Sequence, residues 1–460
     1  MSASDPAHPI PASSSSCTRR DLLAGAVAGA IGAGALGAAP AARAQFNIPT
    51  SSRELWQWAR VQPVGNSRIA WLDAASSGPT LRAAMAEEYR AREIQSLEIA
   101  SFARTDRWST ESTQLATRFA TFIGCDPEEV VFTHGAGEAL SMVAGGLDLA
   151  SGDEILTTSQ EHPAAISPWL FQARRRGVVV KQITLPTPLT SAQQVVEQFT
   201  AALSDKTKII AFSHVQYADG AILPVRELCQ LARQRNLLSV VDGAQALGML
   251  NFNLRDLGCD FYAAAFHKWL AGCHGTGMLY VRRDRLDRLW PLEPRGIDAS
   301  PPLATPTQAA GQSAVTPALH KLGNVVPQLW PALMGGEAAL AFHDQIGRVR
   351  IEARVRELVL YARMSLQQLP GIEWLTPNAP GLWGGILTFR LPGRISANVV
   401  AALAGVNRVY FTALDWPNAA PNPAPGAGPD RGALRLSLHI FNSYDDVDRL
   451  VQGLKLLPKP

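Results

Sequence analysis

Short apolar runs and amphipathic stretches alternate along the middle of the chain, from about Val130 to Val281. The lengths of the apolar runs are typical of strands, and the helical spacing of apolar residues between them predicts helices. The strands are expected at 130–133, 154–158, 178–183, 208–212, 238–241 and 261–264, and the helices at 138–149, 191–203 and 224–235. This alternation predicts an α/β fold with a mostly parallel sheet covered on both faces. Functional residues should follow the carboxyl ends of the strands.

The remainder of the chain predicts a second, smaller domain, since 460 residues are too many for one typical core. A Pro-, Ala- and Gly-rich stretch at 291–328 is typical of a linker or crossing loop, and 417–430 of a mobile surface loop. A long amphipathic helix is expected at 334–369, strands at 385–391 and 435–438, and a last helix at 443–457. The expected parts are a leader at 1–44, a segment at 45–75 packing on the small domain, a large domain at 76–310 and a small domain at 311–460.

Composition and charge indicate an ordinary globular enzyme. Hydrophobic residues make up 47% and charged residues 18% of the chain. The small net charge of +3 makes no case for a nucleic-acid partner, which would require a concentrated basic patch. Of the five cysteines, Cys17 lies in the leader. The other four have no C-x-x-C spacing, so no metal site is expected and single buried thiols are the expectation. They are Cys125, Cys229, Cys259 and Cys273, and the sequence does not determine any disulfide pairing.

The first residues resemble a twin-arginine signal peptide. Arg19 and Arg20 precede a Gly/Ala-rich apolar run at 22–39, and Ala42-Arg43-Ala44 has the small residues of a leader peptidase site. The resemblance implies export in folded form, cleavage before Gln45, a periplasmic or secreted location and only transient contact with a membrane. The alternative is a retained membrane anchor, because the run is about 18 residues long.

A Gly-rich segment follows the first predicted strand, in Thr133-His134-Gly135-Ala136-Gly137-Glu138. Small residues at the start of a helix let backbone N–H groups approach a phosphate, where the helix dipole also favours an anion. Two alternatives remain from the residues alone. The segment could be half of a dinucleotide fingerprint, although Leu140 stands where the third glycine belongs, or simply a tight turn.

Three further clusters follow predicted strands. His162 comes after the second strand, where a structural histidine is the ordinary alternative. Asp242, with Gln245 three residues later, ends an apolar strand, and a buried carboxylate there needs a cationic or hydrogen-bonding partner. His267 and Lys268 follow three alanines and a phenylalanine. An amine in such apolar surroundings should have a lowered pKa, as a Schiff-base lysine requires, although a surface lysine is the alternative.

Together, the order and spacing of these clusters resemble the class V aminotransferase family of pyridoxal-phosphate fold type I. A phosphate loop, a histidine, an aspartate with a glutamine three residues on, and a His-Lys pair about 25 residues later carry the resemblance. It extends from about Ala70 to the carboxyl end. Cysteine desulfurases, selenocysteine lyases, kynureninase and isopenicillin N epimerases belong to this family. The resemblance implies a large domain with a mostly parallel seven-stranded sheet between helices and a smaller α+β domain at the carboxyl end.

The resemblance also implies a role for each residue. Lys268 would hold pyridoxal 5'-phosphate covalently and then move the proton at the alpha carbon of the substrate. Asp242 would pair with the ring nitrogen, so that the ring accepts electrons. His162 would stack on the ring, and Gln245 would hydrogen-bond the phenolic oxygen. His267, with the backbone of Gly135, Ala136 and Gly137, would bind the phosphate. Arg435 would bind the substrate carboxylate. For Arg435 an ordinary surface arginine is the alternative.

Departures from the family pattern narrow the activity. Ala136 or Gly137 replaces a threonine that commonly contacts the phosphate, and Tyr217 stands where desulfurases have an asparagine. The segment 410–430 contains no cysteine, which disfavours a persulfide mechanism. The helix beginning near Met334 is most similar to the isopenicillin N epimerase-like branch.

The expected activity is a reaction at the alpha carbon of an amino acid or an amino-acid-containing metabolite. Epimerisation, transamination and elimination all remain open. The alternatives are a C-S lyase or desulfurase-like enzyme on a sulfur-containing amino acid, and a non-catalytic binding protein with the same fold. Family resemblance also implies a homodimer in which 291–328 reaches toward the neighbouring subunit.

Overall fold

The computed structural model describes residues 44–65, 68–98, 107–292, 321–323, 326–415 and 432–458. These belong to one compact unit, Ala44–Pro460. The expected signal peptide, most of the expected linker at 291–328 and the expected loop at 417–430 lie outside the described residues. Export, cleavage before Gln45 and the reach of the linker therefore stay predictions.

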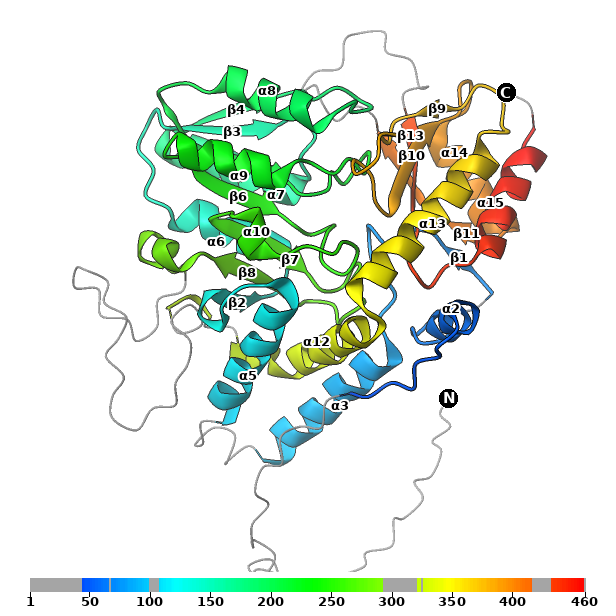
Figure 1. Cartoon of the computed structure of the whole chain (residues 1–460), viewed down its shortest axis with the longest axis horizontal. Coiled ribbons are helices and arrows are strands. Elements are labelled where there is room, and N and C mark those ends of the chain that lie inside the picture. The colour runs from blue at the N-terminus through cyan, green and yellow to red at the C-terminus, as the bar shows by residue number, and fades with distance from the viewer. Residues whose placement is uncertain are drawn as a thin grey trace, which may run out of the picture. The chain divides into compact units, whose positions relative to one another are not determined.

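A seven-stranded sheet forms the larger part of the fold, with the strand order β2-β8-β7-β6-β5-β3-β4 (Figure 1). Its strands are β2 (Val130–Thr133), β3 (Glu154–Thr158), β4 (Val179–Ile183), β5 (Thr207–Ser213), β6 (Leu238–Asp242), β7 (Phe261–Ala265) and β8 (Gly277–Val281). Every neighbouring pair from β4 to β7 is parallel, and β8 alone runs antiparallel to its neighbours β7 and β2. The predicted mostly parallel seven-stranded sheet is confirmed.

Helices cover both faces of this sheet, as the alternation predicted. Adjacent residues of one strand enter different cores, because side chains in a strand alternate between faces. Val131 packs with Leu140 of α6 and Trp169 of α7, whereas Phe132 packs with Phe119 of α5. The helices around the sheet are α3 (Arg82–Leu97), α5 (Arg107–Ile123), α6 (Ala136–Gly146), α7 (Pro163–Arg176), α8 (Ala192–Ala202), α9 (Val225–Gln234), α10 (Leu254–Leu257) and α12 (Val326–Ile346), with 3-10 turns η1 (Pro127–Glu129) and η2 (Arg283–Arg288).

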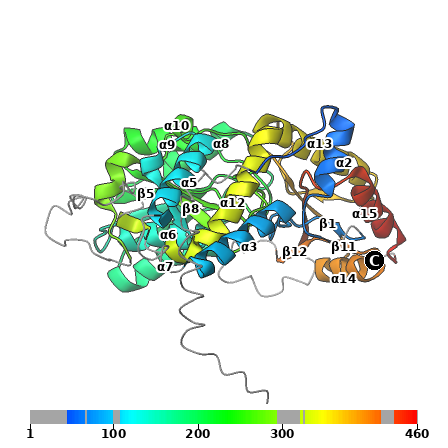
Figure 2. The same ribbon diagram turned by 90° about the horizontal axis from the view of Figure 1, so that it is seen from below.

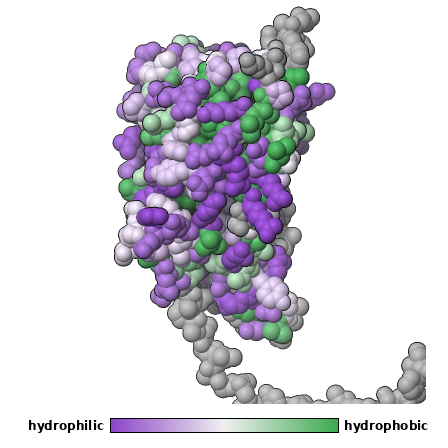
Figure 3. Space-filling view, turned by 90° about the vertical axis from the view of Figure 1, so that its right-hand side faces the viewer, coloured by the Kyte–Doolittle hydropathy of each residue, from purple (hydrophilic) through white to green (hydrophobic). Residues whose placement is uncertain are grey.

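The carboxyl-terminal part is α+β. Four antiparallel strands lie in the order β12-β13-β10-β9, and β1 pairs in parallel with β11, which joins the amino-terminal segment to this part. The side of the molecule that carries this part is largely hydrophilic in its lower portion and has a continuous hydrophobic area toward the top (Figure 3). The elements are α2 (Ser52–Arg60), β1 (Ala70–Trp71), α13 (Arg348–Leu366), β9 (Glu373–Trp374), β10 (Ile386–Arg390), α14 (Ser396–Val406), β11 (Val409–Tyr410), β12 (Thr412–Asp415), β13 (Gly432–Ser437) and α15 (Tyr444–Leu456). The domain boundaries themselves stay predictions.

The single long helix expected at 334–369 is wrong. The chain forms α12 and α13 instead, separated at Gly347, whose φ of +95° no residue of a right-handed helix adopts. α12 also begins earlier, at Val326, and is buried along 329–343, so it is not amphipathic. It runs beside α3 and packs on α5 (Figure 2). The sequence did not reveal this break, because the helical spacing of apolar residues continues on both sides of Gly347.

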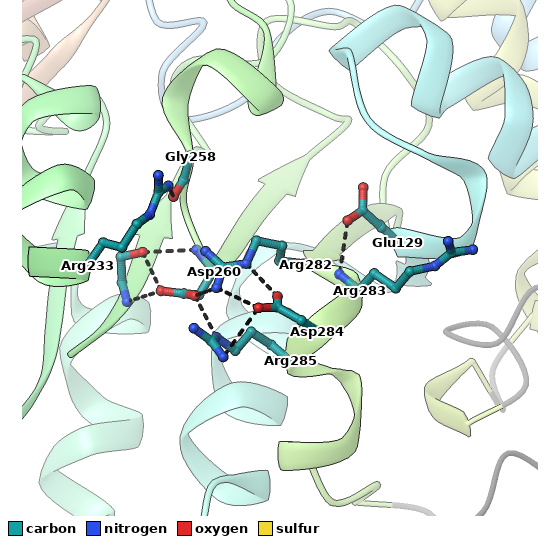
Figure 4. A network of polar contacts seen from close by, with 9 residues as sticks. Glu129, Arg233, Gly258, Asp260, Arg282, Arg283, Asp284 and Arg285 are labelled. Atoms are coloured by element: carbon teal, nitrogen blue, oxygen red, sulfur yellow. Dashed lines mark hydrogen bonds and ion pairs between the residues drawn. The ribbon is translucent and has the colours of Figure 1, made fainter. Parts of the chain in front are cut away.

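A polar network fixes the amino ends of β6 and β7, opposite the edge where ligands are expected (Figure 4). Asp260, directly before β7, is buried and accepts hydrogen bonds from the backbone and hydroxyl of Ser239 in β6, both at 2.8 Å. Its carboxylate also pairs with Arg282 at 2.9 Å and Arg285 at 2.8 Å. A buried charge with this many partners is stabilised in place. The network therefore sets the register of the two strands that carry Asp242 and Lys268 at their other ends.

Candidate active site

The predicted site residues follow strands whose carboxyl ends lie at one edge of the sheet. Asp242 is the last residue of β6, and Lys268 comes three residues after the end of β7. His162 precedes α7 after β3, and Gly135 precedes α6 after β2. Because β2, β3, β6 and β7 run in the same direction, these residues gather as the sheet topology predicted.

Lys268 lies within electrostatic reach of Asp242, Arg435 and Asp73. Burial is the main cause that lowers the pKa of Lys268, and the positive charge of Arg435 lowers it further. The carboxylates of Asp242 and Asp73 act in the opposite direction and raise it. The net lowering favours the neutral amine, which is the form that attacks a carbonyl or accepts a proton. The half-buried position of Lys268 and its charged neighbours argue against the surface-lysine alternative.

Asp242 is a buried carboxylate with one fixed oxygen. Its Oδ1 atom accepts a hydrogen bond of 2.9 Å from the backbone nitrogen of Ala244, and its side chain is buried. Burial raises the pKa of Asp242, while the Ala244 hydrogen bond and the charge of Lys268 lower it. A carboxylate held this way can bind a cationic nitrogen with its other oxygen.

Glu161 is a second buried carboxyl group beside Asp242, which the sequence reasoning had not singled out. Thr158 and Ser213 donate side-chain hydrogen bonds to it from the ends of β3 and β5. Burial raises the pKa of Glu161 to about 7, and the nearby charge of Asp242 adds to the rise. Its position before His162 was the available signal.

His162 is held by its own helix. Its Nδ1 atom accepts a hydrogen bond of 3.1 Å from the backbone nitrogen of Ala164, which caps α7. Burial, with the charges of Lys268 and Arg435, lowers the pKa of His162 to about 4. The ring is therefore neutral near pH 7 and carries its proton on Nε2. It meets the ring of Tyr217 edge-on, at 4.9 Å between centroids.

Gln245 is tied down on two sides. Its Oε1 atom accepts a hydrogen bond of 2.8 Å from the indole nitrogen of Trp269, and its Nε2 atom donates one of 2.9 Å to the carbonyl of Ala75. An amide nitrogen carries two protons, so one remains for a ligand. Its predicted hydrogen bond to the cofactor ring stays a prediction that this geometry permits.

The predicted phosphate end combines a helix start with His267. Gly135 is the residue before α6, and a Cβ atom placed on it would meet nothing within 4 Å. The first backbone N–H groups of a helix have no partner within the helix and favour an anion. The Nδ1 atom of His267 is buried without a hydrogen-bond partner among the described residues. Burial is the main cause that lowers the pKa of His267 to about 4.

Arg435 is 3% exposed, so the surface-arginine alternative is wrong. Its Nη2 atom contacts Asp73 at 2.9 Å and Ser76 at 2.6 Å, and its Nη1 atom donates to the carbonyl of Tyr217 at 2.9 Å. The Nε atom is buried without a partner among the described residues. Asp73 also accepts a hydrogen bond from Thr412. Neither Asp73 nor Ser76 was predicted as a site residue.

Gly78 contacts the backbone of His267 and Lys268 in the loop that follows β7, here called the lysine loop. Its nitrogen donates a hydrogen bond of 2.8 Å to the carbonyl of His267, and a Cβ atom on Gly78 would overlap the carbonyl oxygen of Lys268. Gly78 also lines a cavity of about 610 Å³ together with Ser77 and His274. No sequence motif had indicated this contact.

A model of the family Aminotransferase class-V matches residues 71–450. The chain belongs to this family. It is 32% identical to isopenicillin N epimerase of Amycolatopsis lactamdurans over 88% of its length and 99% of the relative, and 29% identical to a cysteine desulfurase of Yersinia pestis over 91% and 98%. Among solved structures, a cysteine desulfurase of Escherichia coli shares the fold, with a TM-score of 0.71, 22% identity and coverage of 87% and 97%.

Membership makes this chain a pyridoxal-phosphate-dependent enzyme. A further structure with the same fold, with a TM-score of 0.72 and 22% identity over 87% of this chain and 99% of its own, is the C-DES mutant with glycine covalently linked to the cofactor. The residues present fit this cofactor. The orphaned Nδ1 of His267 and the open space at Gly135 suit a phosphate, Asp242 suits a ring nitrogen, and Lys268 is an amine with a lowered pKa.

Three further features of the described residues bear on the site: the cysteines, the possible metal ligands and the length of the helices. All four cysteines in the described part of the chain are free and buried, as expected. Across the described ranges, no group of three or more His, Cys, Asp or Glu could hold a metal ion. None of the helices described is long and apolar enough to cross a membrane.

Proposed function

We propose that this enzyme acts at the alpha carbon of an amino acid or an amino-acid-containing metabolite, as an epimerase or aminotransferase. The observation that carries the proposal is the grouping of half-buried Lys268 with the buried side chains of Arg435 and Asp242, both of which act electrostatically on it. It joins an amine able to move a proton, a guanidinium able to bind a carboxylate and a carboxylate able to hold a cationic ring.

Each side chain has a distinct task in this scheme. Arg435 binds the substrate carboxylate with its unpartnered Nε edge, which orients the alpha carbon. Neutral Lys268 removes the alpha proton and can return it, because burial lowers its pKa. The cofactor supplies the electron sink when bound. A non-catalytic binding protein would need neither the lowered pKa of Lys268 nor the buried Asp242.

The buried cysteines disfavour a desulfurase that forms a persulfide on its own cysteine. A thiolate is the nucleophile in such chemistry. Burial is the main cause that raises the pKa of Cys229 to about 12 and holds the thiol pKa of Cys125, Cys259 and Cys273 above its usual value. A C-S lyase needs no such cysteine and stays the second candidate. The C-DES structure, described as a cystine C-S lyase, shares the fold.

Two measurements test the proposal. At least one candidate amino acid incubated with the enzyme in deuterium oxide should gain deuterium at the alpha carbon. If no candidate exchanges, the result would count against the proposal. Release of sulfide, a persulfide or pyruvate from cystine would instead favour the lyase. In the Lys268→Ala protein, the visible absorption band of the bound cofactor should change, and an unchanged band would refute the role of Lys268.

We also propose that the protein is exported behind a twin-arginine signal and acts as a homodimer. The support for export is the pair Arg19 and Arg20 before an apolar run and a small-residue cleavage site. Replacing both arginines by lysine should retain the protein in the cytoplasm with its leader uncleaved. Sedimentation of the mature protein should give twice the mass of one chain, and a monomer would refute the dimer.

A further inference from the structure

Trp269, directly after Lys268, joins the lysine loop to three other parts of the chain. Its side chain is fully buried, and its indole nitrogen donates to Gln245 at 2.8 Å. Its carbonyl oxygen lies 3.0 Å from Nε2 of His343 in α12 and 2.9 Å from Nε2 of His439 after β13. The indole also stacks on the ring of His439, with 5.8 Å between centroids and 13° between planes.

These contacts leave Trp269 little freedom to move. The Nδ1 atom of His439 has no partner in the described part of the chain, and its Nε2 atom faces a carbonyl oxygen, so Nε2 must carry the proton. His343 faces carbonyl oxygens with both ring nitrogens, Nδ1 toward Ala339 and Nε2 toward Trp269, and a neutral ring has only one proton to donate. The carbonyl of Trp269 is therefore held by the hydrogen bond from His439 in the carboxyl-terminal part and lies in contact with His343 of α12.

The orientation of the Gln245 amide follows from Trp269. An indole nitrogen only donates and the Ala75 carbonyl only accepts, so oxygen must face Trp269 and nitrogen must face Ala75. Rotating the amide by 180° would oppose donor to donor and acceptor to acceptor, both in a buried place where unsatisfied groups are costly. Only the amide nitrogen has a proton left to donate.

We propose that Trp269 is a positioning residue that fixes the Gln245 amide so that its nitrogen donates to the ring oxygen of the bound cofactor. The inference uses the family's cofactor and the contacts of this chain, and does not depend on which reaction follows at the alpha carbon. A hydrogen-bond donor stabilises negative charge on the ring oxygen. It would therefore favour the deprotonated form of the Lys268 nitrogen beside that oxygen when the cofactor is bound. Trp269 thereby tunes the cofactor without touching it.

The test compares Trp269→Phe with the wild type in the absence of substrate. Pyridoxal 5'-phosphate should bind the variant apoprotein about tenfold more weakly, as for the loss of one hydrogen bond. The pH midpoint of the visible band of the bound cofactor should rise by roughly one unit. Trp330→Phe makes the same change at a buried tryptophan of α12 and should leave both values unchanged. No change in either value for Trp269→Phe would overturn the proposal.

A double-mutant cycle separates positioning from packing. On a Gln245→Ala background, Trp269→Phe should have almost no further effect on the pH midpoint, because the amide that it orients is gone. An equal shift on both backgrounds would mean that Trp269 acts only through packing. If Trp269→Phe does not fold, Gln245→Met removes the donor without adding a charge. It should raise the midpoint as well, and an unchanged midpoint would refute the inference.

Discussion

The Nη2 atom of Arg435 lies 2.9 Å from the Oδ1 atom of Asp73, in an ion pair whose side chains are 4% and 11% exposed. Arg435 comes from β13 and Asp73 from the segment after β1, so the pair joins distant parts of the chain. The arginine proposed to bind the substrate carboxylate thus already has a carboxylate partner. Its Nε atom, buried without a partner among the described residues, is the part that we propose binds the substrate.

Removing the charge of Asp73 should destabilise the apoprotein. Asp73→Asn leaves the buried guanidinium of Arg435 without its counter-charge, and breaking one side of such a pair costs about 3–5 kcal/mol. Urea unfolding of the apoprotein should show a loss toward the lower end of that range, since Ser76 and the Tyr217 carbonyl still accept from Arg435. Asp73→Asn combined with Arg435→Met should recover part of the loss, and strict additivity would contradict the coupling of the two residues.

A methyl group at Gly78 should disturb the lysine loop. In Gly78→Ala the new Cβ atom would overlap the carbonyl oxygen of Lys268 and lie 2.7 Å from its carbonyl carbon, so the backbone at Lys268 must shift. Overpacking of this kind costs about 1–3 kcal/mol. We expect a corresponding fall in the free energy of unfolding together with a changed visible band of the bound cofactor. Gly405→Ala, in α14 with open space around it, should be neutral or slightly stabilising.

A methyl group at Gly135, unlike one at Gly78, should leave the stability of the protein nearly unchanged and weaken cofactor binding. Nothing lies within 4 Å of a Cβ atom there, so Gly135→Ala should leave the stability of the apoprotein within about 0.5 kcal/mol. If this open space belongs to the phosphate, the methyl group should weaken binding of pyridoxal 5'-phosphate by at least roughly tenfold. Fluorescence titration of the apoprotein measures this, and unchanged affinity would place the phosphate elsewhere.

How far the sequence predicts this structure depends on the range of the contacts. The strands β2 and β3 have the predicted bounds, because each is a short run of residues that are all buried and that turn or loop residues follow. Lys268, Asp242 and His162 could be singled out as candidates because each follows such a run. The contacts of Arg435 with Asp73 and of Gln245 with Ala75 were not found, since they join residues 362 and 170 positions apart. Complementary packing, as of Gly78 against Lys268, leaves no periodic pattern.

Acid should weaken the link between Trp269 and His439. Burial is the main cause that lowers the pKa of His439 to about 3, with help from the nearby His343, whereas an unfolded histidine has a pKa of about 6.5. The unfolded chain therefore binds this proton more tightly. The stability contributed by neutral His439 is fully present above pH 6.5 and is lost as the pH falls toward 3.

The variant His439→Gln isolates this effect, because glutamine can still donate to the Trp269 carbonyl but does not titrate. At pH 5.0 the wild type loses roughly 2 kcal/mol through His439 that the variant cannot lose. The destabilisation caused by His439→Gln should therefore be about 2 kcal/mol smaller at pH 5.0 than at pH 7.5, measured by urea unfolding of the apoprotein. Phe389→Leu, at a buried position of β10 without a titrating group, should destabilise equally at both pH values. An equal cost of His439→Gln at both pH values would mean that His439 is not held neutral by burial.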